Sequence, residues 1–350
     1  MAIPTEPIGS IPRPAALLDA MAPAISPIVL AAAQQAALVD TIRRFEATGS
    51  PIISDGEQTK SSFVTYPLTG LTNLAPGGVV IPFADGHTRE LPVITAGPFR
   101  YGAHAAGFVE AARQITDHPI KQAVISVSAL ALLYPEQPIA DYPRERFLDD
   151  LVDEGEADIR GALAAGADSV QIDFTEARLS LKLDPSGDLL RSFIALNNRV
   201  VRRFDAATRA KLGVHVCPGG DHDSTHSAHV DVRGLLAQLF DLDVGRFFLQ
   251  MASEPDPDRA LAFIASHRRE GQRIYIGVTD PIDPRVETAD EVCARVLQAA
   301  RHLPVECLGT CDDCGFSPFA DDRSTARDVA FAKIAARVRG TQLAATQLGV

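Results

Sequence analysis

The feature that most constrains this chain is a His-x-Cys pair at the end of a short apolar run. Val214 and Val216 alternate with His215 and Cys217, and the run stops at Pro218 and two glycines, a pattern typical of a buried strand. Residues two apart on a strand point to the same side, so His215 and Cys217 are expected to project together. An imidazole and a thiolate are two of the four ligands that tetrahedral zinc prefers. The run therefore predicts half of a metal site.

A Cys-x-x-Cys pair far downstream, Cys311 and Cys314, can supply the missing soft ligands. The alternative is a buried histidine and a buried free cysteine that share a strand without binding a metal. The two pairs taken together favour zinc. A zinc-bound thiol loses its proton near neutral pH, and sulfur ligands add negative charge that lowers the Lewis acidity of the metal. Such a site suits alkylation of a thiol better than hydrolysis.

The charge and the apolar content of the chain argue against some classes of binding partner. A formal charge of -12 over 350 residues argues against nucleic acid and anionic membranes, because no basic patch offsets it. The first residues lack a secretory pattern, and no run reaches the roughly 18 apolar residues of a membrane helix. The five cysteines, an odd number, suggest reduced thiols, so we expect a cytoplasmic protein. The sequence allows a homo-oligomer without predicting one.

Short apolar runs alternate with longer segments of helical period along most of the chain. Eight runs are interpreted as buried strands: 4–8, 51–54, 123–127, 169–172, 212–216, 246–251, 273–278 and 304–308. Helical segments lie near 144–164, 187–203, 230–240, 256–269, 288–301 and 324–339. Eight strands alternating with helices predict a (β/α)8 TIM barrel, with a doubly wound open sheet as the alternative.

The region 59–120 breaks this rhythm. Glycine-containing turns flank two short apolar runs, 79–83 and 91–95, and a helical pattern follows over 108–116. We interpret the region as a hairpin-containing insertion between strands 2 and 3 rather than as a second domain. The prediction is a single catalytic domain over 1–350.

Polar residues and metal-binding residue types follow the ends of most predicted strands. In a barrel these ends meet on one rim, where the chemistry takes place. The rim residues are Ser10, Asp55, Glu57, Asp173, Glu176, His215, Cys217, Glu254, Asp280, Cys311 and Cys314. Each carboxylate has an ordinary alternative role as a helix cap or a salt-bridge partner. Glu57 and Asp173 together are suited to hold an ammonium group, as in an amino-acid substrate.

Six motifs, in this order, resemble the C-terminal catalytic half of cobalamin-independent methionine synthase over nearly the whole chain. They are Ile8-Gly-Ser-Ile-Pro12, Asp55-Gly-Glu57, Gln171-Ile-Asp173, His215-Val-Cys217, Asp283-Pro-Arg285 and Asp313-Cys-Gly315. The resemblance implies a zinc-dependent methyltransferase on a (β/α)8 barrel, which moves a methyl group to a thiol, most directly homocysteine to give methionine. It implies zinc bound by His215, Cys217 and Cys314, and it leaves Cys311 without a counterpart.

The resemblance also implies where the substrates bind. Ser10, Glu57 and Asp173 would hold the amino-acid part of homocysteine. The N-terminal half of the long methionine synthases, with part of their folate-binding apparatus, is expected to be missing. The chain also has no tryptophan to stack on a pterin. The methyl or alkyl donor, whether folate, a corrinoid or another small electrophile, therefore stays open.

Two positions depart from the pattern of the family. Its glutamate zinc ligand falls near Gln250 or Met251, where no carboxylate stands, so Glu254 is the expected fourth ligand. Its catalytic histidine falls at Ile282. Proton delivery to a leaving group would then fall to Asp283 or to His226, one of three histidines in the loop after the ligand strand.

A related branch of the superfamily gives a second interpretation. Epoxyalkane:coenzyme M transferase is similar to this family and opens an epoxide with a zinc-bound thiolate. In such an enzyme Arg178 and Lys182 would meet a sulfonate, whereas a retained Glu57 and Asp173 favour an amino-acid thiol. A zinc-storage or scaffold protein is a further alternative. A closed structural site, however, would not be expected to recruit carboxylates from several strand ends.

Overall fold

A parallel sheet of six strands forms the centre of the molecule. The computed structural model describes residues 3–22 and 25–350. The strands pair in chain order: β5 (Lys121–Ile125), β6 (Ser169–Asp173), β7 (Leu212–Val216), β10 (Arg246–Leu249), β11 (Arg273–Gly277) and β12 (Leu308–Cys311). Almost every residue in them is buried, as expected for a parallel sheet covered on both faces.

Two further segments extend the sheet at its edges. Thr5 forms a parallel bridge with Thr310 of β12, and Ile53 forms one with Ile120, just before β5. The two added segments meet where Ile11 N donates to Gly56 O at 3.0 Å. In the described ranges this junction is made by hydrogen bonds rather than by a paired ladder. The order of eight parallel segments is that of the predicted (β/α)8 fold.

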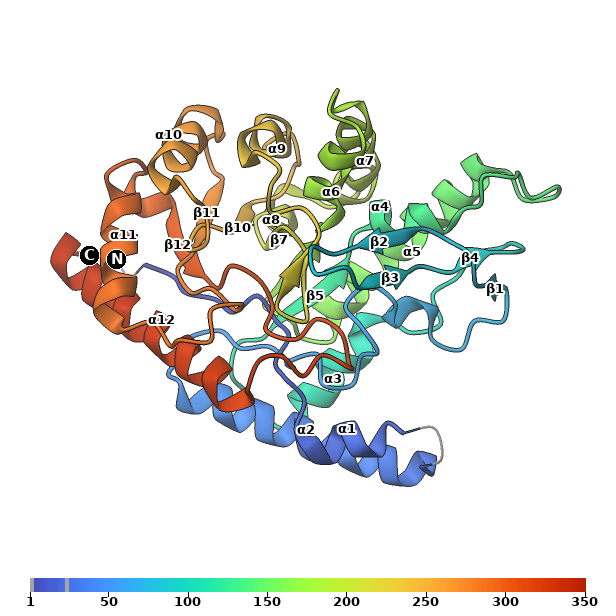
Figure 1. Cartoon of the computed structure of the whole chain (residues 1–350), viewed down its shortest axis with the longest axis horizontal. Helices are drawn as coiled ribbons and strands as arrows, with labels where there is room; N and C mark the ends of the chain where they lie inside the picture. Colours follow the sequence, from blue (N-terminus) through green and yellow to red (C-terminus); the bar gives the residue numbers. More distant parts are fainter. Residues whose placement is uncertain (1–2, 23–24) are drawn as a thin grey trace.

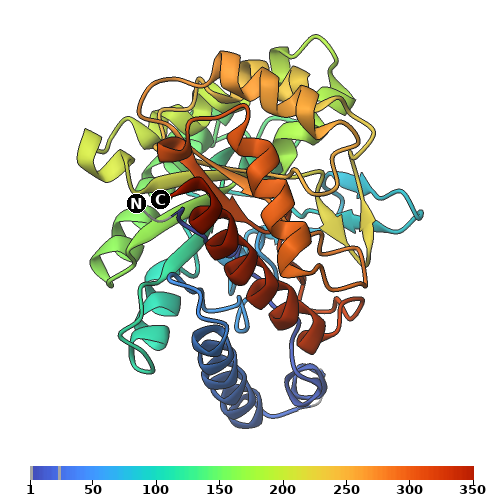
Figure 2. The same cartoon turned by 90° about the vertical axis from the view of Figure 1, so that its left-hand side faces the viewer.

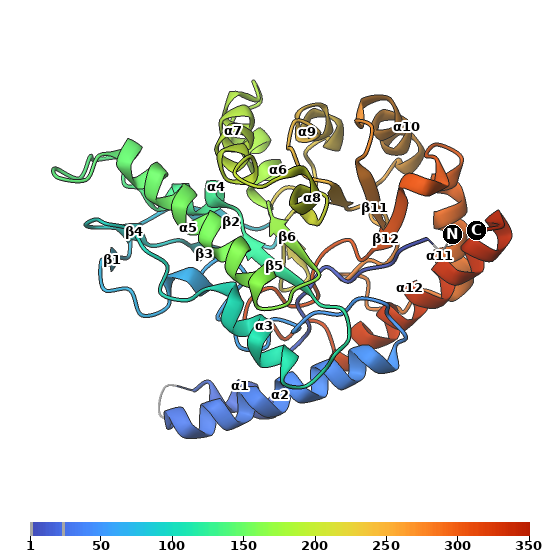
Figure 3. The ribbon, with the colours of Figure 1, turned by 180° about the vertical axis from the view of Figure 1, so that it is seen from behind.

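The helices surround the strands on the outside (Figure 1 and Figure 3). The longer ones are α2 (Pro27–Ala47), α3 (Ala105–Arg113), α5 (Arg144–Ala164), α7 (Asp188–Val201), α9 (Val232–Leu239), α10 (Pro257–His267), α11 (Ala289–Ala300) and α12 (Arg327–Leu348). Figure 2 shows α12 running alongside α11. The first long helix also meets the last, because Phe45 and Phe331 pack edge to face at 5.4 Å. This contact brings the two ends of the helical layer together.

The insertion forms two small antiparallel pairs, which confirms the hairpin prediction. The strand β1 (Leu74–Ala75) pairs with β4 (Val93–Ile94), and β2 (Val80–Pro82) pairs with β3 (Thr88–Glu90). The tip of the β2–β3 hairpin reaches a second hairpin, β8 (Gly220–Asp221) and β9 (Ser224–Thr225), where Ala84 N donates to Thr225 O at 3.0 Å. The insertion thus lies over the loop that follows β7, the strand that carries His215.

Several predicted boundaries were wrong. The eighth strand is 308–311 rather than 304–308, because 305–307 form a 3-10 turn and the chain enters the sheet only at Leu308. The helix expected at 108–116 spans Ala105–Arg113, and the last helix starts at Arg327 and runs to Leu348. A short helix, α6 (Glu176–Leu183), was not predicted. None of the described helices combines the length and hydropathy needed to cross a membrane.

Candidate active site

Three of the predicted metal ligands meet on the rim of the sheet. His215 lies on β7, Cys217 follows it, and Cys314 follows β12. Their ligand atoms all lie within 4.8 Å of one another, and the two sulfurs are 3.2 Å apart. Because β7 and β12 are not neighbours in the sheet, the cluster spans the rim.

The chemistry of these three residues fits a bound metal. His215 is 2% exposed, and in the described part of the chain neither of its ring nitrogens has a hydrogen-bond partner. A buried imidazole without partners is costly unless something else binds it. The adjacent sulfur of Cys217, together with burial, raises the pKa of the Cys314 thiol well above its ordinary value. A cation among these ligands would offset that effect, since metal coordination favours the thiolate.

Asp313 fixes the backbone beside Cys314. Its Oδ1 accepts hydrogen bonds from Met251 N and Ala252 N, and its Oδ2 accepts from Ser253 N, all at 2.8 Å. The side chain therefore ties the loop after β10 to the loop after β12. Burial raises the pKa of Asp313 to about 6, although these hydrogen bonds favour its charged form. The sequence did not predict this role of Asp313, and its place next to a predicted ligand in the Asp313-Cys-Gly315 motif was the available signal.

The predicted substrate residues line the same cavity as the metal cluster. The cavity has a volume of about 670 Å³ and is bordered by His215, Cys314, Ser10, Glu57 and Asp173. The rest of its wall is largely apolar and includes Leu18, Phe63, Val64, Ile81, Phe83, Leu132, Leu179 and Phe319. A volume of this size with a few convergent polar groups is typical of a small-molecule site.

Two of the polar residues that border the cavity, Ser10 and Glu57, each have a partner within the chain. Ser10 Oγ accepts from Ser317 N at 3.2 Å, so its own proton stays available to a substrate. Glu57 Oε1 lies 3.0 Å from Lys60 Nζ, and both side chains are buried. Burial raises the pKa of Glu57, and the neighbouring Asp173 raises it further. Glu57 therefore lies at the cavity wall as one half of an ion pair with Lys60, which the sequence pattern did not indicate.

A further carboxyl group, Glu176, borders the cavity at the start of α6. Ser126 Oγ and Ser128 Oγ donate to its Oε1, whereas Oε2 has no hydrogen-bond partner among the described residues. Burial raises the pKa of Glu176 to about 7, and the negative charge of Asp173 adds to the rise. Glu176 was predicted to lie on the rim, but the sequence indicated no function for it.

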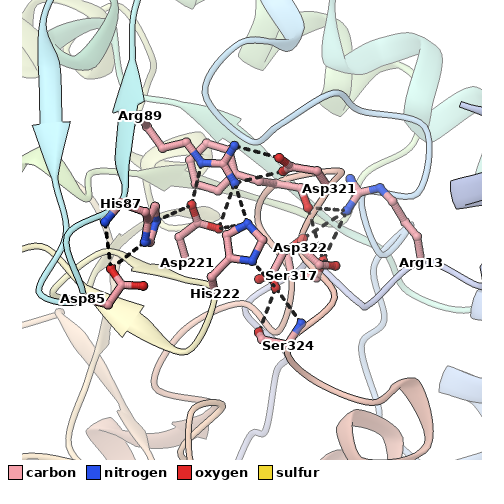
Figure 4. A network of polar contacts seen from close by, with 11 residues as sticks. Arg13, Asp85, His87, Arg89, Asp221, His222, Ser317, Asp321, Asp322 and Ser324 are labelled. Carbon is pink, nitrogen blue, oxygen red and sulfur yellow. Dashed lines mark hydrogen bonds and ion pairs between the residues drawn. The ribbon is translucent and has the colours of Figure 1, made fainter. Parts of the chain in front are cut away.

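Arg89 on β3 holds the insertion against the rim (Figure 4). Its guanidinium donates to both oxygens of the buried Asp221 and, at 2.9 Å, to Asp321 Oδ1. It also lies 4.2 Å from the centre of the Phe319 ring. A second group with metal-like spacing, Asp221, His222 and Asp322, occurs here. Arg89 already supplies the positive charge that Asp221 faces, so we attribute this cluster to the attachment of the hairpin.

Other predicted residues lie apart from the three ligands. Glu254, the expected fourth ligand, is not in the group that His215, Cys217 and Cys314 form. It pairs instead with Arg178 Nη2 at 3.2 Å. Cys311, the last residue of β12, is buried, and its thiol donates to Tyr275 O of β11 at 3.6 Å. It does not join the cluster among the described residues. Among the described residues, neither Glu254 nor Cys311 belongs to the group of three ligand residues.

The two predicted proton donors have different surroundings. Asp283 accepts a hydrogen bond from Arg285 N and is not among the described residues that border the cavity. His226 does border it and packs edge-on against Phe83 at 5.5 Å. Burial, followed by the charges of Lys182 and Arg178, lowers the pKa of His226 to about 4.

The cations proposed for a sulfonate are used within the chain. Arg178 donates to Val230 O and Ala228 O as well as to Glu254, and Lys182 Nζ donates to His226 O at 2.9 Å. These contacts fix the loop after the ligand strand and leave the two side chains poorly placed to bind an anion.

A family model described as "Cobalamin-independent synthase, Catalytic domain" matches residues 3–337. The chain belongs to the cobalamin-independent synthase family. It is 24% identical over 323 residues to a 5-methyltetrahydropteroyltriglutamate–homocysteine methyltransferase of Streptomyces coelicolor, covering 89% of this chain and 39% of that relative. It is 22% identical to a methionine synthase of Pyrococcus abyssi, covering 99% of this chain and 94% of the relative. The chain thus spans about two fifths of the Streptomyces enzyme.

Solved structures of this synthase type share the fold. A B12-independent methionine synthase from Shewanella sp. W3-18-1, determined in complex with selenomethionine, has a TM-score of 0.78 at 20% identity and covers 99% of both chains. A putative vitamin-B12-independent methionine synthase from Listeria monocytogenes has a TM-score of 0.71 at 20% identity and covers 98% of both. At this identity the likeness establishes the shared fold.

Proposed function

We propose that this member of the synthase family is a zinc-dependent methyltransferase that converts homocysteine to methionine. The observation that carries the proposal is the cavity in which His215 and Cys314 lie with Ser10, Glu57 and Asp173. A soft-metal cluster and an amino-acid subsite thus open into one space. The activities for which the Streptomyces and Pyrococcus relatives are named agree with this reaction.

His215, Cys217 and Cys314 would hold the zinc. A bound zinc ion lowers the pKa of a thiol that coordinates it, so that the sulfur is a thiolate at neutral pH. Catalytic zinc sites commonly use three protein ligands and leave the fourth position to substrate. Because Glu254 is paired with Arg178, we assign the fourth position to the substrate sulfur.

The amino-acid part of homocysteine would lie among Ser10, Glu57 and Asp173. Ser10 has a free hydroxyl proton for the substrate carboxylate. The two buried carboxyl groups raise one another's energy when both are charged, and an ammonium group between them would relieve that repulsion. Lys60, which donates to Glu57, offsets only part of the negative charge, because one ammonium group faces two carboxyl groups.

The methyl donor proposed here is a 5-methyltetrahydropteroyl compound, following the name of the Streptomyces relative. The apolar part of the cavity offers the rings of Phe63, Phe83 and Phe319 in place of a tryptophan. Epoxide opening with coenzyme M is not favoured, because Arg178 and Lys182 are engaged by the chain itself.

The test is metal analysis of the purified protein, followed by calorimetric titration with homocysteine and with coenzyme M. We expect one zinc per chain and proton release on adding homocysteine only. Cys217→Ser should lose both metal and activity, whereas Cys293→Ser, on α11, should retain both. A Cys217→Ser protein with full zinc and full turnover would contradict the assignment of the site.

A further inference from the structure

One proton of the proposed reaction has no assigned source. When a methyl group leaves a neutral nitrogen, that nitrogen must gain a proton, because its anion is a poor leaving group. Ile282 stands at the position of the family's catalytic histidine, and its neighbour Asp283 lies outside the cavity among the described residues. His226 borders the cavity, but its lowered pKa leaves it uncharged at neutral pH, where it is a weak acid.

Glu176 has the surroundings of a proton donor. It borders the cavity directly after β6, the strand that also carries Asp173. Both serine hydroxyls converge on Oε1. Oε2 is a buried atom without a hydrogen-bond partner among the described residues, so it is the oxygen that can carry the proton. The negative charge of Asp173 acts on Glu176 and favours its protonated form. No ion pair in the described part of the chain neutralises Glu176.

We propose that Glu176 contacts the methyl donor and delivers the proton to its leaving nitrogen, which makes the donor class a neutral N-methyl amine. The inference rests on the proposed function. In the transfer step the thiolate sulfur forms the new S–C bond while the C–N bond breaks and its electron pair stays on nitrogen. The proton of Glu176 passes to that nitrogen. The proton released earlier by the homocysteine thiol restores Glu176, so protons and charge balance.

Two methyl donors, only one of which needs a proton on its leaving group, distinguish a proton-donating Glu176 from a structural one. The zinc-loaded wild type and Glu176→Gln are compared with homocysteine and either 5-methyltetrahydropteroyltriglutamate or methyl iodide, whose iodide leaves without a proton. We expect Glu176→Gln to lower kcat with the folate donor by about 100-fold or more, with methyl iodide turnover within about twofold of wild type after subtraction of the uncatalysed rate.

A second readout does not depend on activity. Infrared difference spectra of the free protein should show a carboxylic-acid carbonyl band that disappears as the pH rises through about 7 and that is missing from Glu176→Gln. Zinc content and homocysteine binding should be unchanged in the variant.

The outcomes are distinguishable from a failure of the proposed function. Full folate-dependent turnover by Glu176→Gln, an equal loss with both donors, or no titrating band in the wild type would each overturn the role of Glu176 alone. A wild-type protein that binds zinc and homocysteine but does not use the folate donor would overturn both the donor and this role. A protein without zinc would overturn the proposed function first.

Discussion

Asp313 and Ser253 are joined by two hydrogen bonds, from Ser253 N at 2.8 Å and from Ser253 Oγ at 2.7 Å, both to Asp313 Oδ2. The pair connects the loop after β10 with the loop after β12, directly beside Cys314. One side chain therefore sets the position of a candidate metal ligand relative to a different strand end. This is the role that hydrogen-bond partners outside the ligand set play in metal sites.

Asp313→Asn is expected to weaken metal binding and to destabilise the protein. In the variant an NH2 group replaces one of the two carboxylate oxygens, and it cannot accept the hydrogen bonds that this oxygen accepts in the wild type. At least one buried donor therefore loses its acceptor, at a cost of about 1–3 kcal/mol. Zinc affinity should fall by roughly 10-fold. Urea unfolding and competition with a metal chelator measure the two effects. Unchanged zinc affinity would show that Asp313 does not position Cys314.

Gly315→Ala should weaken homocysteine binding while leaving the metal in place. A Cβ at this position would lie 2.1 Å from Ser10 Oγ, so Ser10 must move. We expect KM for homocysteine to rise about 10-fold, equivalent to one lost hydrogen bond of about 1.4 kcal/mol. Gly107→Ala on α3 meets nothing within 4 Å and is the matched control. Normal homocysteine binding by Gly315→Ala would contradict the role of Ser10.

Arg89→Ala should release the β2–β3 hairpin from the rim, because it removes the contacts to Asp221 and Asp321 together. We expect faster amide hydrogen exchange over residues 80–90 and a higher KM for the donor, with zinc content unchanged. Arg160→Ala, which removes an exposed salt bridge on α5, is the control. Hydrogen exchange equal to wild type would show that the hairpin does not depend on Arg89.

The raised pKa of Glu176, about 7, predicts how the rate responds to pH. If the acid form donates the proton, kcat with the folate donor should be level in the acid range and fall as pH rises through about 7. Ser128→Ala removes a hydroxyl that stabilises the carboxylate, so the pKa should rise and the falling limb should move to higher pH. Ser180→Ala, whose hydroxyl bonds Ala177 O instead, is the control. A limb that does not move with Ser128→Ala would contradict this origin of the pH dependence.

The contribution of Glu176 to the free energy of unfolding should also fall as the pH rises through about 7. The folded pKa of Glu176 lies above the usual value of 4.5, so its contribution is fully present below about 4.5 and is lost as pH rises through about 7. The loss is at most about 3 kcal/mol. Urea unfolding of wild type and Glu176→Gln at several pH values measures it. A difference between the two proteins that stays constant with pH would contradict the shift.

Much of the fold follows from local patterns. The helix predicted at 144–164 has those bounds in the structure, and the strand predicted at 212–216 does as well. Thr288 and Glu291 form a capping box at the start of α11, as a helix start signal predicts. Such features depend on residues within a few positions of one another, so the amino-acid order is enough to predict them.

The pairing of polar side chains depends on distant segments and was not predictable in the same way. Glu254 had the chemistry of a zinc ligand, but Arg178, 76 positions away, binds it instead. Glu57 was expected to hold the ammonium group of a substrate together with Asp173, yet Lys60 of the same chain also pairs with it at 3.0 Å. A carboxylate takes whichever cation the folded chain brings nearest, and only three-dimensional proximity selects it.

By itself, the amino-acid sequence determined the alternation of strands and helices and the side-by-side projection of His215 and Cys217. It did so because side-chain direction along a strand follows from chain spacing alone. The tertiary structure alone decided that Glu254 pairs with Arg178, and that Glu176 borders the cavity with one oxygen that has no partner among the described residues. Both outcomes depend on the packing of strand ends far apart in the chain, where burial and neighbouring charges set the chemistry of each group.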